Sequence, residues 1–113
     1  MSPKKEKSPF DEELYIKLGI NNLILFSLYS LEADKKTATF EKLLEKCFLL
    51  FPKVFCFNEL KKWPDARKLD RPLRNLRAKK FIKGDPSTVF SLTLIGEKKA
   101  KEIAKSLIQK KLL

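Results

Sequence analysis

The feature that most constrains this chain is an apolar stretch near its N-terminus. Between Leu14 and Leu31 apolar residues fall on almost every side of a helix, which is typical of a central buried helix rather than a surface one. The uncharged part, Leu18 to Leu31, spans 14 residues and is shorter than the roughly 20 residues that a membrane span needs. We therefore expect a helical core and no membrane partner.

The helices that follow can be placed from capping residues and periodicity. Thr39 is a suitable N-cap for a second helix, which Pro52 ends. Asp70 is a good N-cap for a helix over residues 71–81, with Pro72 in its first turn, where a missing N–H is tolerated.

The two ends of the chain complete the expected fold. Residues 81–92 read as two short strands around a turn, and residues 94–113 predict a closing helix with an apolar stripe. Residues 1–13 predict a disordered tail. The expected fold is therefore mainly α with a small β-hairpin, in one domain of residues 14–113.

The composition excludes most enzyme classes. The chain has no histidine, which removes the commonest general base, the nucleophile–histidine pairs and the histidine-containing zinc sites. Gly19, Gly84 and Gly96 are too scattered for a phosphate-binding loop or a dinucleotide fingerprint. Cys47 and Cys56 sit among apolar residues, where a buried thiol is the usual outcome. We expect a protein of the reducing cytoplasm that is not an enzyme and uses no cofactor and no metal.

The positive charge is confined to the C-terminal half of the chain. The formal net charge is +11. Residues 1–52 carry eight lysines and eight acidic residues, whereas residues 53–113 carry 17 basic and six acidic residues. Residues 60–83 alone hold ten basic residues against Asp65 and Asp70. Such a local field favours a polyanion, with nucleic acid first and an anionic membrane surface second.

The arginines are separated from the lysines. All four arginines lie within residues 67–77, although the chain has 21 lysines. The planar fork of arginine binds phosphates or guanine edges bidentately. On a helix over residues 71–81, Arg71, Arg74 and Asn75 fall on a face without large apolar residues. That face is free to meet a partner.

The order of elements resembles the winged helix-turn-helix domain. Leu73-Arg74-Asn75-Leu76-Arg77-Ala78-Lys79-Lys80-Phe81-Ile82 is similar to a recognition helix that runs into the wing. Residues 90–96 resemble the second wing strand and the Leu-Thr-x-x-Gly start of the last helix in MarR-like and PadR-like regulators. Lys80 stands where these families usually have glycine. The helix-turn-helix pair would begin at Thr39 or, as the chain separation favours, at Asn58.

The resemblance implies a set of DNA-binding residues in and around the predicted recognition helix. The helix over residues 71–81 would read the major groove, with arginine to guanine or phosphate and Asn75 to adenine. The flanking basic residues would bind phosphates, and the hairpin would reach the minor groove or the backbone, although Asp85 at its tip repels phosphate. The candidate residues are Lys61, Lys62, Arg67, Lys68, Arg71, Arg74, Asn75, Lys79, Lys83, Ser87 and Thr88.

The expected function is sequence-specific binding of double-stranded DNA by a transcriptional regulator. The apolar stripe of the closing helix either folds back on the first helix or meets a second subunit, and its excess at the chain end favours a homodimer. Two alternatives remain: a winged-helix interaction module whose basic face binds an acidic partner, and an RNA-binding accessory domain. A small-molecule effector is neither predicted nor excluded.

The aromatic residues between the second helix and the basic segment have two interpretations. They could form a stacking platform for single strands. Because charges are not interleaved among them, we expect core packing instead, with Trp63 as a lid on the core. The group consists of Phe48, Phe51, Phe55, Phe57 and Trp63.

Overall fold

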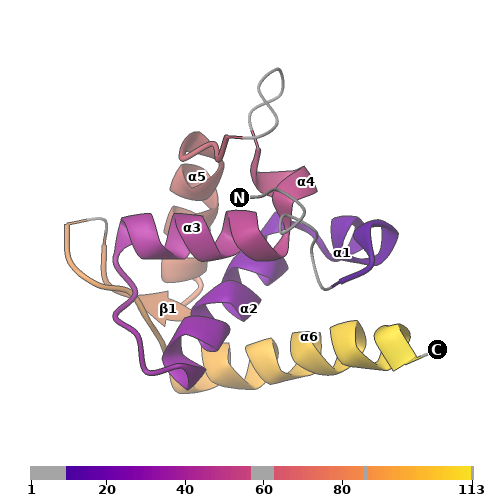
Figure 1. The fold of residues 1–113 in the computed structure, drawn as a ribbon. Helices are drawn as coiled ribbons and strands as arrows, with labels where there is room; N and C mark the ends of the chain where they lie inside the picture. The colour runs from indigo at the N-terminus through magenta and orange to yellow at the C-terminus, as the bar shows by residue number, and fades with distance from the viewer. Residues whose placement is uncertain (1–9, 57–62, 86, 113) are drawn as a thin grey trace.

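The chain folds as six helices and one two-stranded antiparallel sheet within the part that the structure describes (Figure 1). This computed structural model describes residues 10–56, 63–85 and 87–112, with side chains described as far as residue 107. The expectation of a mainly α fold with a small β-hairpin is confirmed. The elements are α1 (Glu12–Leu18), α2 (Ile20–Ala33), α3 (Phe40–Leu50), α4 (Pro52–Phe55), α5 (Arg67–Ala78), β1 (Ile82–Lys83), β2 (Ser91–Leu92) and α6 (Leu94–Leu112).

Helix α2 lies at the centre, and the other elements surround it. It contacts α3, α5, α6 and β2; in Figure 1, α3 crosses in front of it and α6 runs beneath it. Leu23, Ile24 and Leu28 have no exposed surface. Burial on several sides explains why apolar residues surround this helix in the sequence, and the prediction of a central buried helix is confirmed.

The apolar stretch is two helices rather than one. Gly19 ends α1 and begins α2 with a φ of 90°, which glycine adopts easily. The two helices are bent by 106° at this point. None of the described helices is by itself long and apolar enough to cross a membrane; α1 and α2 pass that test only as a bent pair.

The described chain begins earlier than the predicted domain boundary at residue 14. The ring of Phe10 lies 5.6 Å from that of Phe26 and 5.7 Å from that of Phe51, measured between centroids. Helix α1 then starts at Glu12. The structure therefore places residues 10–13 in the folded domain, because Phe10 gains an aromatic environment there. Residues 1–9 of the predicted tail lie outside the described residues.

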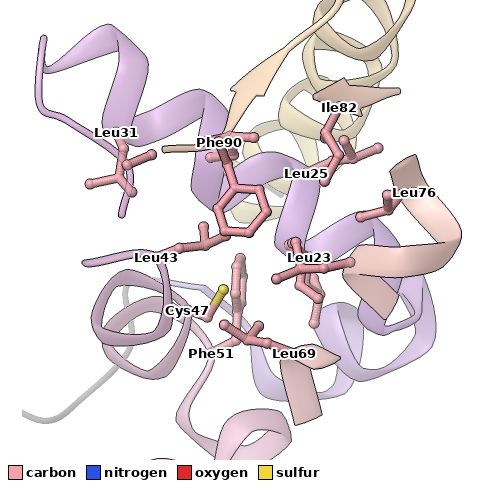
Figure 2. Packing of buried hydrophobic residues seen from close by; sticks show 14 of the residues in the cluster. Leu23, Leu25, Leu31, Leu43, Cys47, Phe51, Leu69, Leu76, Ile82 and Phe90 are labelled. Carbon is pink, nitrogen blue, oxygen red and sulfur yellow. The ribbon is translucent and has the colours of Figure 1, made fainter. Parts of the chain in front are cut away.

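The aromatic group is largely part of the core. Phe51 and Phe55 are fully buried, and Phe51 packs with Cys47, Leu43 and Leu69 around α2 (Figure 2). Burial raises the pKa of the Cys47 thiol to about 12, so this cysteine stays protonated.

Trp63 differs from the buried members of the aromatic group. The prediction for Trp63 is wrong, since 57% of its surface is exposed. It is one of the exposed large apolar residues of the described chain, in the segment that precedes α5. Phe57 lies outside the described residues.

Helix α3 is bounded as the sequence predicts. The hydroxyl of Thr39 accepts a hydrogen bond from the Lys42 N–H at 3.2 Å, which confirms Thr39 as the N-cap. The helix ends at Leu50, and Pro52 then begins α4 at a position where its missing N–H costs nothing.

The hairpin is bound to the connection between α2 and α3. In the sheet Ile82 pairs with Leu92. In addition, the Phe90 N–H donates to the carbonyl of Ala38 in that connection at 2.8 Å, and the Leu92 N–H donates to the carboxylate of Glu32 near the end of α2 at 2.8 Å. The ring of Phe90 points into the core (Figure 2). These contacts fix where the hairpin stands relative to the helices.

A left-handed residue joins α5 to the hairpin. Lys80 has a φ of 65°; its N–H donates to the Arg77 carbonyl and the Phe81 N–H donates to the Leu76 carbonyl, both at 3.0 Å. This is the Schellman arrangement, which glycine usually completes. The lysine thus occupies the expected glycine position and adopts the glycine conformation.

Helix α6 begins against the same junction. The Thr93 hydroxyl accepts from the Gly96 N–H at 3.1 Å and donates to the Lys80 carbonyl at 2.7 Å. A Cβ atom on Gly96 would overlap the Phe81 carbonyl oxygen. The Leu-Thr-x-x-Gly pattern therefore has a physical basis here, because threonine caps the helix and glycine permits its close approach to the chain before β1.

The apolar stripe of α6 is buried within its own chain. Ala100, Ile103 and Leu107 are at most 5% exposed, and α6 lies against α2. The side chain of Ile108 lies outside the described residues. The stripe therefore no longer favours a second subunit, and the homodimer stays a prediction without that support.

We expect Lys80→Gly to stabilise the fold by about 1 kcal/mol, because a left-handed conformation is costly for a residue with a Cβ. Chemical denaturation followed by circular dichroism measures this change. The matched control is Lys79→Gly, at a φ of −85°, which should destabilise by about 0.5–1 kcal/mol. Equal effects of the two substitutions would contradict the assigned conformation.

We expect Gly96→Ala to destabilise the fold by about 1–3 kcal/mol through overlap with the Phe81 carbonyl. Helix propensity alone predicts the opposite sign, because alanine is the better helix former by about 1 kcal/mol. The sign of the change in the midpoint of urea unfolding therefore decides the matter. Lys99→Ala, at an exposed position of the same helix, should change the midpoint little.

Candidate nucleic-acid interface

Helix α5 has one buried face and one exposed face. Leu69, Leu73 and Leu76 recur at spacings of four and three residues and belong to the core. The opposite side is exposed and has no large apolar residue. This outer face of α5 consists of Arg67, Arg71, Arg74, Asn75 and Ala78.

The observed helix differs from the predicted range of residues 71–81 at both ends. It begins at Arg67 and ends at Ala78, so Asp70 is not its N-cap and Pro72 lies inside it. The helix starts earlier because a different aspartate binds its first turn. The earlier start adds Arg67 to the same face as Arg71, one turn away.

Asp65 holds the start of α5. It is 4% exposed, and its carboxylate accepts from the Arg67 backbone N–H at 3.1 Å and from the Arg67 guanidinium at 3.2 and 3.3 Å. Its own N–H donates to the Phe55 carbonyl at 2.8 Å, which connects α5 to α4. The hydrogen bonds from Arg67 lower the pKa of Asp65.

The arginines of the outer face differ in how they are held. Arg74 lies 3.5 Å from Asp70, and both side chains are about two-thirds exposed, which makes a weak surface pair. Within the described part of the chain, the side chains of Arg71 and Asn75 form no hydrogen bond or ion pair. These two side chains are therefore available to a partner.

The tip of the hairpin is organised around an acidic residue. The Asp85 carboxylate accepts from the N–H of Ser87 at 2.9 Å and from its hydroxyl at 2.7 Å. The Thr88 hydroxyl also donates to this carboxylate, at 3.4 Å from the same oxygen. The bonds from Ser87 lower the pKa of Asp85. The hydroxyls proposed for DNA contact thus bind Asp85 instead, and a negative charge stands between them.

The remaining predicted DNA-binding residues differ in their exposure to solvent. Lys79 follows the end of α5 and Lys83 belongs to β1, and both are exposed. Lys68 is half-buried on the side of α5 next to the core. Lys61 and Lys62 lie outside the described residues. Among the residues with described side chains, no group of three acidic or cysteine residues could hold a metal ion.

Arg77 was not among the predicted site residues. One nitrogen of its guanidinium donates to the Gly84 carbonyl at 2.8 Å, so this arginine connects α5 to the turn of the hairpin. Its position one turn after Arg74 on the same helix was a signal in the sequence that it lies near the other site residues. The partner was not visible in the sequence, because the contact requires the hairpin to fold back along α5.

We expect Asp65→Asn to lower the melting temperature at pH 7, because it removes the charged partner of Arg67. Because the pKa of Asp65 is lower in the folded state than in the unfolded state, its carboxylate stabilises the fold at any pH above the ordinary aspartate pKa. This stabilisation is lost as the pH falls through the lowered pKa. The difference from the natural chain should therefore shrink between pH ~5 and ~2. Thermal melts across this range test it. Asp70→Asn removes the same charge from an exposed pair and should have little effect; an equal loss would contradict the role of Asp65.

The candidate interface thus comprises the outer face of α5, Arg77 and the exposed lysines at the hairpin. No protein-family model, curated protein or solved structure matches the chain.

Proposed function

We propose that this chain is a winged helix-turn-helix protein that binds double-stranded DNA sequence-specifically through the outer face of α5. One observation carries the proposal: an exposed helix face with three arginines and an asparagine, and no large apolar residue, stands directly beside a hairpin. A helix fits the major groove, and arginine and asparagine are the side chains that pair bidentately with guanine and adenine there.

The arrangement of the elements supports the same proposal. Helices α2, α3 and α5 precede a hairpin and a last helix, in the order of a winged helix. The hydrogen bond from Phe90 to Ala38 attaches the hairpin to the chain between α2 and α3. One departure is the long connection from α3 to α5, which includes α4. The alternative start of the helix-turn-helix pair at Asn58 lies outside the described residues.

Different residues would supply specificity and affinity. Arg71 and Asn75, whose side chains have no partner in the described chain, would read bases. Lys79 and Lys83 would act as point charges on phosphates, giving a share of affinity that falls with salt. The protein would act as a cytoplasmic transcriptional regulator. As a homodimer it would place one α5 from each subunit on a DNA site with two-fold symmetry.

We expect Arg71→Ala with Arg74→Ala to weaken duplex binding by roughly 1–3 kcal/mol for each arginine that binds a base or a buried phosphate. The melting temperature should change little, since both side chains lie outside the core. Fluorescence anisotropy with a randomised DNA duplex, followed by selection of preferred sequences, measures affinity and specificity. The matched control is Lys99→Ala with Lys105→Ala, which removes the same charge from exposed positions on α6.

The same titration separates the alternative functions. An RNA duplex bound more tightly than DNA at matched salt would favour an RNA-binding domain. Binding to an acidic polypeptide without salt-dependent binding to DNA would favour an interaction module. An equal decrease of DNA affinity in the α5 variant and the α6 control would mean that only the general field binds DNA, and the assignment of the outer face would be wrong.

A further inference from the structure

A cavity lies between α5 and the hairpin. Its volume is about 230 Å³, many times the roughly 10–15 Å³ that one water molecule requires. It is lined by Asp70, Leu73, Arg74, Arg77 and Phe90. Four of these residues belong to α5, and Phe90 precedes β2.

The lining divides into an apolar floor and a charged rim. Leu73 and Phe90 are at most 4% exposed and belong to the core, so the floor is fixed by packing. The rim consists of the exposed residues Asp70, Arg74 and Arg77. Two guanidinium groups on one rim, against one carboxylate, leave an excess of one positive charge.

The two guanidinium groups are positioned differently. Arg77 donates one N–H bond to the Gly84 carbonyl at 2.8 Å. A guanidinium has five N–H groups, so this bond orients the fork and leaves other donors for a ligand. Arg74 lies 3.5 Å from Asp70 in an exposed pair. Such a pair is weak, so Arg74 can exchange this partner for an anion at small cost.

We propose that this cavity binds one phosphate group between Arg74 and Arg77. Arginine forks match the oxygens of phosphate in geometry and charge. The inference rests on the proposed function in one respect: the phosphate is that of a nucleic-acid backbone, with free phosphate as the other source of the same chemistry. Because Arg77 also binds Gly84, the bound phosphate is connected to the hairpin turn and determines the hairpin's position on the duplex.

The variant that tests the site is Arg77→Lys. It keeps the charge but replaces the fork by a single ammonium, which cannot orient two acceptors as a plane does. The natural chain and the variant are titrated with inorganic phosphate, and with chloride at matched ionic strength. The readout is the NMR signals of the arginine side-chain N–H groups and of the Gly84 and Phe90 amides. Lys99→Ala is the control for removal of one distant charge.

We expect phosphate, but not chloride, to produce saturable shifts at Arg74, Arg77 and Gly84, and Arg77→Lys to weaken them at least about tenfold. In the duplex titration, the same variant should lower affinity about tenfold while Lys99→Ala leaves it unchanged. Shifts that are equal for phosphate and chloride, or that persist in the variant, would overturn the site.

The two titrations fail independently. Saturable phosphate binding without duplex binding would retain the cavity site, with free phosphate as its ligand, and would reject the proposed function. Duplex binding that is unaffected by Arg77→Lys, together with no saturable phosphate shift, would reject the site and leave the proposed function standing. A melting temperature for each variant shows that the fold is intact.

Discussion

The burial of α2 on several sides is the constraint on which the rest of the structure depends. A helix whose apolar residues point in every direction cannot rest on a single neighbour. It therefore requires α3, α5, the hairpin and α6 around it. Because the leucines of α5 are used in this burial, the arginines on its other side have no place except the surface. The candidate interface is thus a consequence of how the core is filled.

The hairpin depends on backbone contacts more than on its own pairing. Two pairs of residues make a sheet that is too short to be stable alone. Its position comes from three connections: the Schellman turn at Lys80, the close approach of Gly96 to Phe81, and the bond from Phe90 to Ala38. Each joins the hairpin to a different helix or its flank. The position of the hairpin is therefore set by the helices that surround it.

Periodicity and caps in the sequence were sufficient for much of the fold. The spacing of Leu73 and Leu76 indicates the buried side of α5, and Thr39 indicates the start of α3, because both signals are local. The start of α5 could not be read in this way. The sequence predicts Asp70 as the N-cap, whereas the helix begins at Arg67, whose N–H binds the Asp65 carboxylate. Asp65 is held there by its contact with Phe55, which is distant in the sequence. The exposure of Trp63 and the contact from Arg77 to Gly84 likewise depend on how distant segments meet.

The Glu32 carboxylate has a consequence for how the chain behaves at high concentration. The N–H groups of Phe90 and Leu92 lie on the same edge of their strand, and Ala38 and Glu32 occupy both of them. A strand edge whose donors are already bound offers no template for a strand from another molecule. The opposite edge belongs to β1, which has only two residues and carries an exposed lysine. Edge-to-edge association, the usual route from a small sheet to aggregation, is thus closed on one side by a side chain from the central helix.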